Sequence, residues 1–409
     1  MTPKITSKEI YFLKNDPEES DIKPPKDYLS DFLLEKTHRI KHFENRLTRT
    51  KIPGKNFLCA AIQISCDHQD GLQEKAETMF ENTFNSLLDH HRGIWESINN
   101  TFFVLAFWDF ENEAKASRLI LSLKEKMSAA LNTHTLVGVS FYPFHKFTKR
   151  QTFANAIKAA DHAAFFGPDT LIHFDATSLN ICGDRLYQLN HCKLAADEYK
   201  KGLELEHGNI NLINSLGVCY AVMGKMDKAT AMFERAMKTN SNEPLVMYNI
   251  GLVNKINNDI ERAIVYLKKA HGIDNKIPEI ELLLGNLLVQ KGRLDKALPH
   301  LETASKLNPE LGAAFRLKGE FFLEKEKYPA AAKEFNTAIK LNPSDTVSLS
   351  GYAKALEKQG KNLFIALTFA KNSVALDPTN TSFKAVLNRI RKKIQATADT
   401  TVHNSKKAL

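Results

Sequence analysis

Small residues recur at a fixed interval of 34 positions through the second half of this 409-residue chain. The first column of this repeat consists of Gly183, Gly217, Gly251, Gly285, Gly319 and, one step further, Ala353. A period of this length is typical of helix pairs that stack on copies of themselves. Small residues are needed where two helices cross closely, because a large side chain would push the backbones apart. The sequence therefore predicts an all-α solenoid in this half.

Two further columns support the helix-pair interpretation. One register is shared by Gly224, Gly292, Gly360, Asn190 and Asn258. Glycine and asparagine tolerate a left-handed backbone best, so this column predicts the turn that ends the first helix of each pair. The large residues that line one seam are Tyr199, Phe233, Leu267, Leu301 and Phe335. No single pair can bury that seam alone, so the pairs must stack.

This pattern resembles the tetratricopeptide repeat (TPR) family, whose consensus is the same ladder of small residues. The resemblance covers residues 176–380 as six repeats. Apolar residues at helical spacing then predict a capping helix over residues 381–396, and residues 397–409 are expected to form a disordered tail. The resemblance implies a right-handed superhelix whose first helices line a concave groove that holds a protein or peptide partner.

Repeat register places a set of polar residues on the groove side of the first helices. These candidates are Asn180, Asp184, Asn211, Asn214, Tyr248, Asn249, Lys255, Asn286, Arg316, Glu320 and Lys354. Asparagine side chains can hydrogen-bond a peptide backbone without reading its side chains. The alternative is that these residues are only the solvated face of each helix. Some family members clamp a C-terminal carboxylate with Lys, Asn and Arg on adjacent repeats, but no such set lies in register here.

The N-terminal half changes to alternating helices and strands. Residues 1–26 are polar and contain NDPEESDIKPP, which predicts a flexible leader. In residues 27–175 the apolar patterns predict helices over 27–49, 72–90, 111–131 and 152–166. Strands are expected over 57–65, 135–142 and 170–174, with a hairpin over 93–107 that turns at Asn99–Asn100. This order predicts an α/β sandwich, joined tightly to the first repeat because no linker-like run separates them.

Several strings in this half are similar to the GGDEF fold of diguanylate cyclases, which is related to the nucleotide cyclase fold. VGVSFYP at 137–143 matches the family's I-G-V-A-x-Y-P strand, and FANAIKAADHAAFFGP at 153–168 matches its L-L-x-x-A-D-x-A-L-Y helix. DYLSDFLLEK, from Asp27, takes the place of the family's opening D-x-L-T-G-L-x-N-R segment. SINNTFFVLAF at 97–107 falls on the R-L-G-G-D-E-F-x-L-L-L hairpin. The resemblance implies a GGDEF-like domain of residues 27–175 ahead of the solenoid.

The residues that perform the chemistry of that family are not kept. Its enzymes hold two divalent ions on carboxylates, and the ions polarise a triphosphate. The corresponding positions here are Ser65, Asp67, Asn99, Asn100, Thr101, Phe102 and Phe103. Asp67 alone cannot hold two ions, so we expect no enzymatic activity, no cofactor and no metal. A competing interpretation is a metal site at Asp67, His68 and Asp70, although a turn with solvated side chains is the commoner explanation of such a cluster.

Composition narrows the remaining classes of protein. The formal net charge of +9 comes from scattered residues rather than from one basic helix, so no nucleic-acid partner is expected. No apolar run reaches the roughly 18 residues of a membrane span. The N-terminal residues lack the layout of a secretory signal, so we expect a cytoplasmic protein. The five cysteines contain no C-x-x-C pair, which argues against a zinc finger or a disulfide framework.

These features predict a non-enzymatic adaptor or scaffold in bacterial signalling or assembly, with a partner peptide or helix in the solenoid groove. The alternative function is a sensor that binds a nucleotide or cyclic dinucleotide in the cleft of the inactive GGDEF-like domain. A third hypothesis is an active cyclase with unfamiliar metal ligands.

Overall fold

The computed structural model of the chain describes residues 27–52, 56–65, 72–87 and 92–407. The chain divides into two compact units, Met1–Ser241 and Asn242–Leu409, and each is described by itself. The leader expected over residues 1–26 lies outside the described residues.

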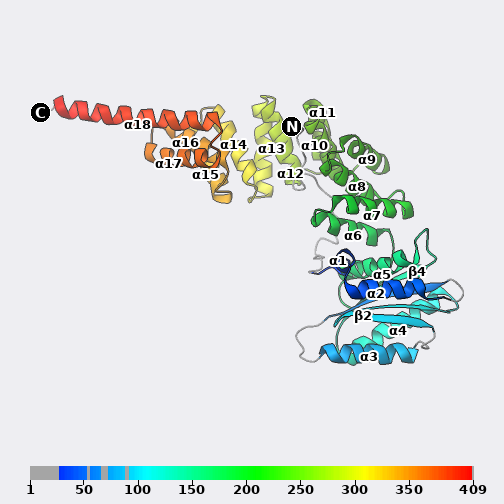
Figure 1. The fold of residues 1–409 in the computed structure, drawn as a ribbon. Helices are drawn as coiled ribbons and strands as arrows, with labels where there is room; N and C mark the ends of the chain where they lie inside the picture. Colours follow the sequence, from blue (N-terminus) through cyan, green and yellow to red (C-terminus); the bar gives the residue numbers. More distant parts are fainter. Residues whose placement is uncertain (1–26, 53–55, 66–71, 88–91, 408–409) are drawn as a thin grey trace. The chain divides into compact units, whose positions relative to one another are not determined.

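The first unit contains a five-stranded sheet (Figure 1). Its strands are β1 (Phe57–Ile64), β2 (Gly93–Asn99), β3 (Phe102–Trp108), β4 (Thr135–Tyr142) and β5 (Leu171–His173). They lie in the order β2-β3-β1-β4-β5, with β1 antiparallel to β3 and β4, and with β5 parallel to β4. Residues 57–62 of the central strand β1 are all apolar and buried, because helices cover both faces of the strand. The strands therefore lie where the sequence predicts them.

Helices cover both faces of the sheet (Figure 1). On one face α3 (Leu72–Leu87) and α4 (Glu113–Leu131) enclose a core that includes Leu58, Ala60 and Ile62. On the other face α2 (His38–Arg49) and α5 (Lys149–Ala163) enclose a core that includes Phe57, Cys59 and Ala61. Alternate residues of a strand point to opposite faces, so the single apolar strand β1 serves both cores. The α/β sandwich architecture is as expected.

The first helix expected from the sequence is in fact two helices. α1 (Asp31–Glu35) is separated from α2 at Lys36, whose φ is +49°. The start of α1 is held by a long-range contact, in which the Asp161 carboxylate of α5 accepts from the backbone N–H groups of Leu29 (2.6 Å) and Ser30 (3.0 Å). This contact joins residues more than 130 positions apart, so it cannot be predicted from local helical spacing. The sequence pattern therefore predicts one continuous helix where the structure has two.

Two helix pairs complete the first unit. They are α6 (Ala176–Gln188) with α7 (Cys192–Leu205), and α8 (Ile210–Val222) with α9 (Met226–Thr239). The α/β part packs onto the first pair, where the buried Lys158 of α5 donates to Glu198 of α7 at 2.5 Å. Arg185 of α6 donates two hydrogen bonds, of 3.1 and 2.5 Å, to Asp31 of α1. The joint is tightly packed, as the lack of a linker predicts.

The second unit consists of four helix pairs followed by a single helix (Figure 1). The pairs are α10 (Pro244–Ile256) with α11 (Ile260–Ile273), α12 (Pro278–Gln290) with α13 (Leu294–Leu307), α14 (Gly312–Glu324) with α15 (Tyr328–Leu341), and α16 (Thr346–Gln359) with α17 (Leu363–Leu376). The single helix is α18 (Thr381–Lys407). The described residues therefore contain the six helix pairs that the repeat predicts.

The small-residue column lies where the two helices of a pair touch. At Gly285 of α12, an added Cβ would lie 2.6 Å from Leu301 Cδ2 of α13. Each of the other column glycines faces the seam residue 16 positions later, in the pairs Gly183–Tyr199, Gly217–Phe233, Gly251–Leu267 and Gly319–Phe335. Positive φ angles occur at all five positions of the turn column, Asn190, Gly224, Asn258, Gly292 and Gly360, and also at Glu326, which has the same register in the fifth repeat. Both columns therefore have the structural roles that their residue types indicate.

The last helix, α18, is longer than the predicted capping helix. Phe383, Val386, Leu387 and Ile390 are buried, as a cap requires. The helical backbone continues to Lys407, which corrects the expectation of a disordered tail up to that residue. The physical reason is that residues 397–407 contain neither Gly nor Pro, so nothing in their sequence ends the helix. Residues 408–409 lie outside the described residues.

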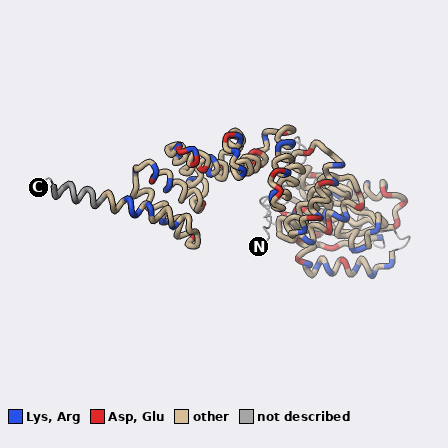
Figure 2. Tube along the Cα trace, turned by 90° about the horizontal axis from the view of Figure 1, so that it is seen from above, with Lys and Arg blue, Asp and Glu red and all other residues tan. Residues whose placement is uncertain are grey.

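Charged residues of both signs are spread along the described chain. Figure 2 shows Lys and Arg interspersed with Asp and Glu, with a basic stretch on α18. The basic residues of that helix up to residue 393 are Lys384, Arg389, Arg391, Lys392 and Lys393. No helix in the described part of the chain combines the length and the apolar character that crossing a bilayer requires. That the chain binds no nucleic acid stays a prediction.

Candidate functional site

Positions that resemble the metal site of GGDEF enzymes lie together at the end of the sheet where β1 finishes. Ile64 N at the end of β1 donates to Thr101 O of the hairpin at 2.8 Å, and Ser65 N donates to His134 O at 2.9 Å. The end of β1, the hairpin turn and the start of β4 therefore lie side by side. Three positions of this region lie outside the described residues: Asp67, His68 and Asp70. The metal site considered for them stays a prediction.

The hairpin uses its signature positions for turn formation and packing. The turn falls at residues 100–101, one residue later than predicted, because Asn99 still pairs with β3 as the last residue of β2. Asn99 Oδ1 accepts from Thr101 N at 2.9 Å and from Thr101 Oγ1 at 3.1 Å. Phe102 and Phe103 are fully buried on opposite faces of the sheet. None of these side chains offers a carboxylate to a metal ion.

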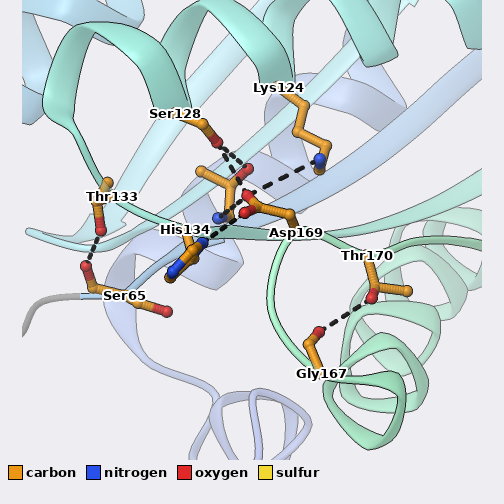
Figure 3. A network of polar contacts seen from close by, with 9 residues as sticks. Ser65, Lys124, Ser128, Thr133, His134, Gly167, Asp169 and Thr170 are labelled. Carbon is orange, nitrogen blue, oxygen red and sulfur yellow. Dashed lines mark hydrogen bonds and ion pairs between the residues drawn. The ribbon is translucent and has the colours of Figure 1, made fainter.

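A polar network lies at the same end of the sheet and is centred on Asp169, in the loop before β5 (Figure 3). The carboxylate accepts from Thr135 N at 3.0 Å and Ser128 Oγ at 3.2 Å, and it pairs with His134 and, at 3.9 Å, with Lys124. Desolvation raises the pKa of this carboxyl, but hydrogen bonds from His134, Thr135 and Ser128 hold it below its ordinary value. The ionised carboxylate ties α4, β4 and this loop together. Its sequence context, Gly-Pro-Asp-Thr, marks only a turn.

The predicted groove residues divide by their exposure. Those that are partly exposed are Asp184, Asn211, Lys255, Asn286, Arg316, Glu320 and Lys354. Those that are buried are Asn180, Asn214, Tyr248 and Asn249. Asn214 and Asn249 are 0% exposed, so neighbouring helices cover them and a peptide cannot reach them in this structure. The accessible candidates of the second unit are therefore Lys255, Asn286, Arg316, Glu320 and Lys354.

Positions four residues apart in the predicted set share one helix face. In α6, Asn180 Nδ2 donates to Asp184 at 3.2 Å, and in α14 the equivalent positions Arg316 and Glu320 lie 3.9 Å apart. Asp184 also accepts from Tyr199 OH at 2.7 Å, and burial raises the pKa of this carboxyl to about 7. In α6 these two positions form hydrogen bonds within the protein, whereas in α14 the equivalent pair is only loosely in contact.

A hollow of about 420 Å³ opens beside Arg316. Its lining residues are Glu310, Gly312, Ala313, Arg316, Leu341, Asn342 and Asp345. They come from the first turn of α14, the end of α15 and the segments before α14 and α16. Arg316 Nε lies 3.5 Å from Asp345 Oδ2, while Glu310 is exposed. Because Asp345 also caps α16, the exposed carboxylate of the hollow is Glu310, which can accept a cationic or amide group.

Two models of the tetratricopeptide repeat match the sequence, over residues 245–277 and 282–346. The chain carries tetratricopeptide repeats. The matched ranges fall on the helices from α10 to α15. Such repeats generally mediate protein–protein interactions and are typically non-enzymatic. Neither match reaches the sheet, so the GGDEF-like identity of the α/β part stays a prediction.

Several solved structures are similar to parts of this chain. YrrB, described as a TPR protein with an unusual peptide-binding site, is 25% identical with a TM-score of 0.36, over 43% of this chain and 90% of its own. PilF of Pseudomonas aeruginosa is 16% identical with a TM-score of 0.49, over 51% and 95%. The APC/C heterotetramer Cut9–Hcn1 is 15% identical with a TM-score of 0.47, over 86% and 59%. The curated proteins contain no match.

Proposed function

We propose that this chain is a non-enzymatic adaptor, in signalling or assembly, that binds a peptide or helix of a partner protein on the first helices of its second unit. The observation that carries this proposal is a row of partly exposed polar residues at equivalent places on successive first helices. Asn286 lies on α12, Glu320 on α14 and Lys354 on α16, each one residue after the small residue of its repeat. A row at the repeat spacing suits an extended ligand, because each repeat presents the same kind of contact.

The hollow beside this row indicates the chemistry of the partner. Glu310 is exposed at its rim, whereas Asp345 already pairs with Arg316 and caps α16 by accepting from Val347 N and Ser348 N. A Lys or Arg side chain of a partner segment can pair with Glu310 there, while Asn342 can hydrogen-bond the segment's backbone. We therefore expect a partner segment with at least one basic residue.

A site-specific cross-linking experiment tests where the partner binds. A photo-activated residue is placed at Asn286 or Lys354, and, as a control, at Lys333 on the exposed side of α15. We expect one protein from the source organism to cross-link at the first two positions and not at the third. Equal cross-linking from all three positions, or from Lys333 alone, contradicts the proposal.

A matched pair of charge reversals tests the chemistry of the hollow. Once the partner segment is known, Glu310→Lys is expected to weaken its binding at least tenfold, because a repulsive charge then faces the basic residue. The control is Glu324→Lys, which makes the same change at an exposed position of α14 outside the hollow. If the two variants bind equally well, the partner does not use the hollow.

The proposal includes a GGDEF-like α/β domain that has lost its chemistry. The packing roles of Phe102 and Phe103 and the turn role of Asn99 support this loss, because these positions supply metal and signature residues in the enzymes that the sequence resembles. Incubation with GTP and Mn²⁺ is expected to leave GTP unchanged by chromatography. A sensor that binds without turnover would instead raise Tm with GTP, ATP or a cyclic dinucleotide, since ligands of the folded state stabilise it.

A further inference from the structure

Three metal-ligating side chains from consecutive helices meet inside the second unit. His271 lies near the end of α11, Glu281 in the first turns of α12 and His300 in α13. Their ligand atoms all lie within 4.8 Å of one another. His300 Nδ1 is 2.7 Å from Glu281 Oε2, and His271 Nδ1 contacts the other carboxylate oxygen, Oε1. Two imidazoles thus hold one carboxylate between them.

Glu281 is a buried acid whose charge is compensated in an unusual way. Its side chain is 0% exposed, and within the described part of the chain its ion pairs are with these two histidines. The buried Glu198 is different, because Lys158 and Lys201 contact it. A buried carboxylate is costly unless a positive charge compensates it. A divalent cation bound by all three groups supplies such a charge.

We propose that His271, Glu281 and His300 form a binding site for a divalent transition-metal ion, with Zn²⁺ the best match. Two imidazole nitrogens and one carboxylate oxygen are a donor set typical of zinc sites with three protein ligands. Ligand atoms lie about 2.0–2.2 Å from zinc, so neighbouring ligands of a tetrahedral ion are roughly 3.4 Å apart. The ligand atoms of this cluster are separated by distances from 2.7 Å or less up to 4.8 Å, so the separation that zinc requires lies within the observed range. Small side-chain rotations would bring all three groups to it.

The proton positions follow from the same geometry. In the hydrogen-bonded arrangement each Nδ1 carries the proton that it donates to the carboxylate. Metal binding needs both Nδ1 lone pairs, so each proton moves to Nε2 or, from an imidazolium, is released to water. His271 and His300 have side-chain exposures of 37% and 20%. A metal ion can therefore enter from solvent and keep a fourth position for water or for a donor group of a partner.

The test uses the full-length protein, stripped with EDTA and titrated with Zn²⁺, and with Co²⁺ for spectroscopy. We expect one equivalent to bind through these residues, with the d–d absorption of tetrahedral Co²⁺ and a Tm that rises with Zn²⁺ concentration. His271→Asn and His300→Asn each keep an N–H close to the place of Nδ1 but remove the imidazole ligand. Each is expected to weaken binding by more than about a hundredfold, beyond the ~10–100-fold effect of outer-shell changes.

Two further variants separate a metal site from a structural ion pair. Glu281→Gln keeps the shape of the side chain and removes its charge, and it should abolish the Co²⁺ spectrum. His207→Asn changes an exposed histidine of the first unit and should leave binding unchanged. The proposal is overturned if Zn²⁺ binds the His271→Asn/His300→Asn double variant as tightly as the wild type. It is equally overturned if these variants lower Tm while the Zn²⁺ affinity and the Co²⁺ spectrum stay the same.

Discussion

Glycines in the sheet of the first unit and in the repeats of the second differ in whether a larger residue could take their place. At Gly138 of β4, an added Cβ would lie 2.1 Å from both Ala156 O and Ala160 N of α5. At Gly285 of α12, it would lie 2.6 Å from the tip of the Leu301 side chain. Backbone atoms of a helix cannot move aside, whereas the end of a leucine can rotate. The sheet therefore requires glycine, and the repeat only favours it.

The sixth repeat already illustrates this tolerance. Its member of the small-residue column is Ala353, which is 0% exposed at the place that glycine takes in the other five repeats. An array held by side-chain contacts can exchange residues while keeping its period, because each contact adjusts locally. The α/β part has no such freedom where a strand touches the backbone of a helix.

The largest effect is expected for Gly138→Ala. Because the new methyl group meets two backbone atoms, the free energy of unfolding should fall by at least about 3 kcal/mol, the upper end of overpacking costs. Both tryptophans, Trp95 and Trp108, lie in β2 and β3, so urea unfolding followed by tryptophan fluorescence reports on this domain. The control is Gly208→Ala, where an added Cβ meets nothing within 4 Å. A loss below about 1 kcal/mol would show that α5 can move away from the sheet.

A smaller effect is expected for Gly285→Ala in the repeats. Displacement of the Leu301 tip should cost about 1–3 kcal/mol, measured by urea unfolding and circular dichroism. In a double-mutant cycle with Leu301→Ala, the combined cost should be less than the sum, because the two changes share one contact. Gly272→Ala in α11 is the control, since its Cβ meets nothing within 4 Å and alanine favours a helix. Strict additivity would contradict the contact.

Two acids of the first unit whose carboxyls are desolvated, Asp161 and Asp184, give a prediction on pH dependence. Burial raises the pKa of Asp161 to about 6 and that of Asp184 to about 7, each from an ordinary value of 3.8. Between the ordinary and the raised pKa, the folded carboxyl keeps a proton that the unfolded chain releases. Stability should therefore fall as pH rises from about 4 to about 7. Denaturant titrations at several pH values measure this slope.

Replacement of each acid by its amide separates backbone contacts from side-chain contacts. Asp184 accepts a hydrogen bond from the Tyr199 hydroxyl, and the amide oxygen of asparagine can accept the same bond. Asp184→Asn should therefore make stability less dependent on pH, and above pH 7 the variant should be more stable than the wild type. Asp161 accepts from the N–H groups of Leu29 and Ser30, and an amide has only one acceptor oxygen for them. Asp161→Asn should therefore be less stable than the wild type at pH 7. If both variants changed stability in the same direction and by the same amount, the proposed difference between backbone and side-chain contacts would be wrong.

The smallest effect is expected for Glu326→Gly in the turn between α14 and α15. Glu326 has a φ of +57° at a place where the other turns use glycine or asparagine. A left-handed glutamate is strained, so glycine should raise the free energy of unfolding by up to about 1 kcal/mol. Asn258→Gly, at the same place in another turn, should change the free energy of unfolding by no more than a few tenths of a kcal/mol. Thermal unfolding of both variants provides the measurement.

Parts of the candidate sites follow from sequence and parts do not. The spacing of Arg316 and Glu320 by one helical turn already places them on one face, and the structure shows them 3.9 Å apart. The burial of Asn214 and Asn249 does not follow, because polar residues on a first helix are expected to be solvated. Exposure depends on which neighbouring helix covers a position, and that is a property of the packed array.

The sequence by itself determined the repeat: its period, its small-residue contacts and the positive φ of Asn190, Asn258 and the glycines of the turn column. These features are local and recur in every unit, so each copy reinforces the same prediction. Only the tertiary structure decided that Asp161 holds the start of α1, and that His271, Glu281 and His300 meet. Such contacts join residues from separate elements, and their meeting depends on how the helices pack rather than on any spacing along the chain.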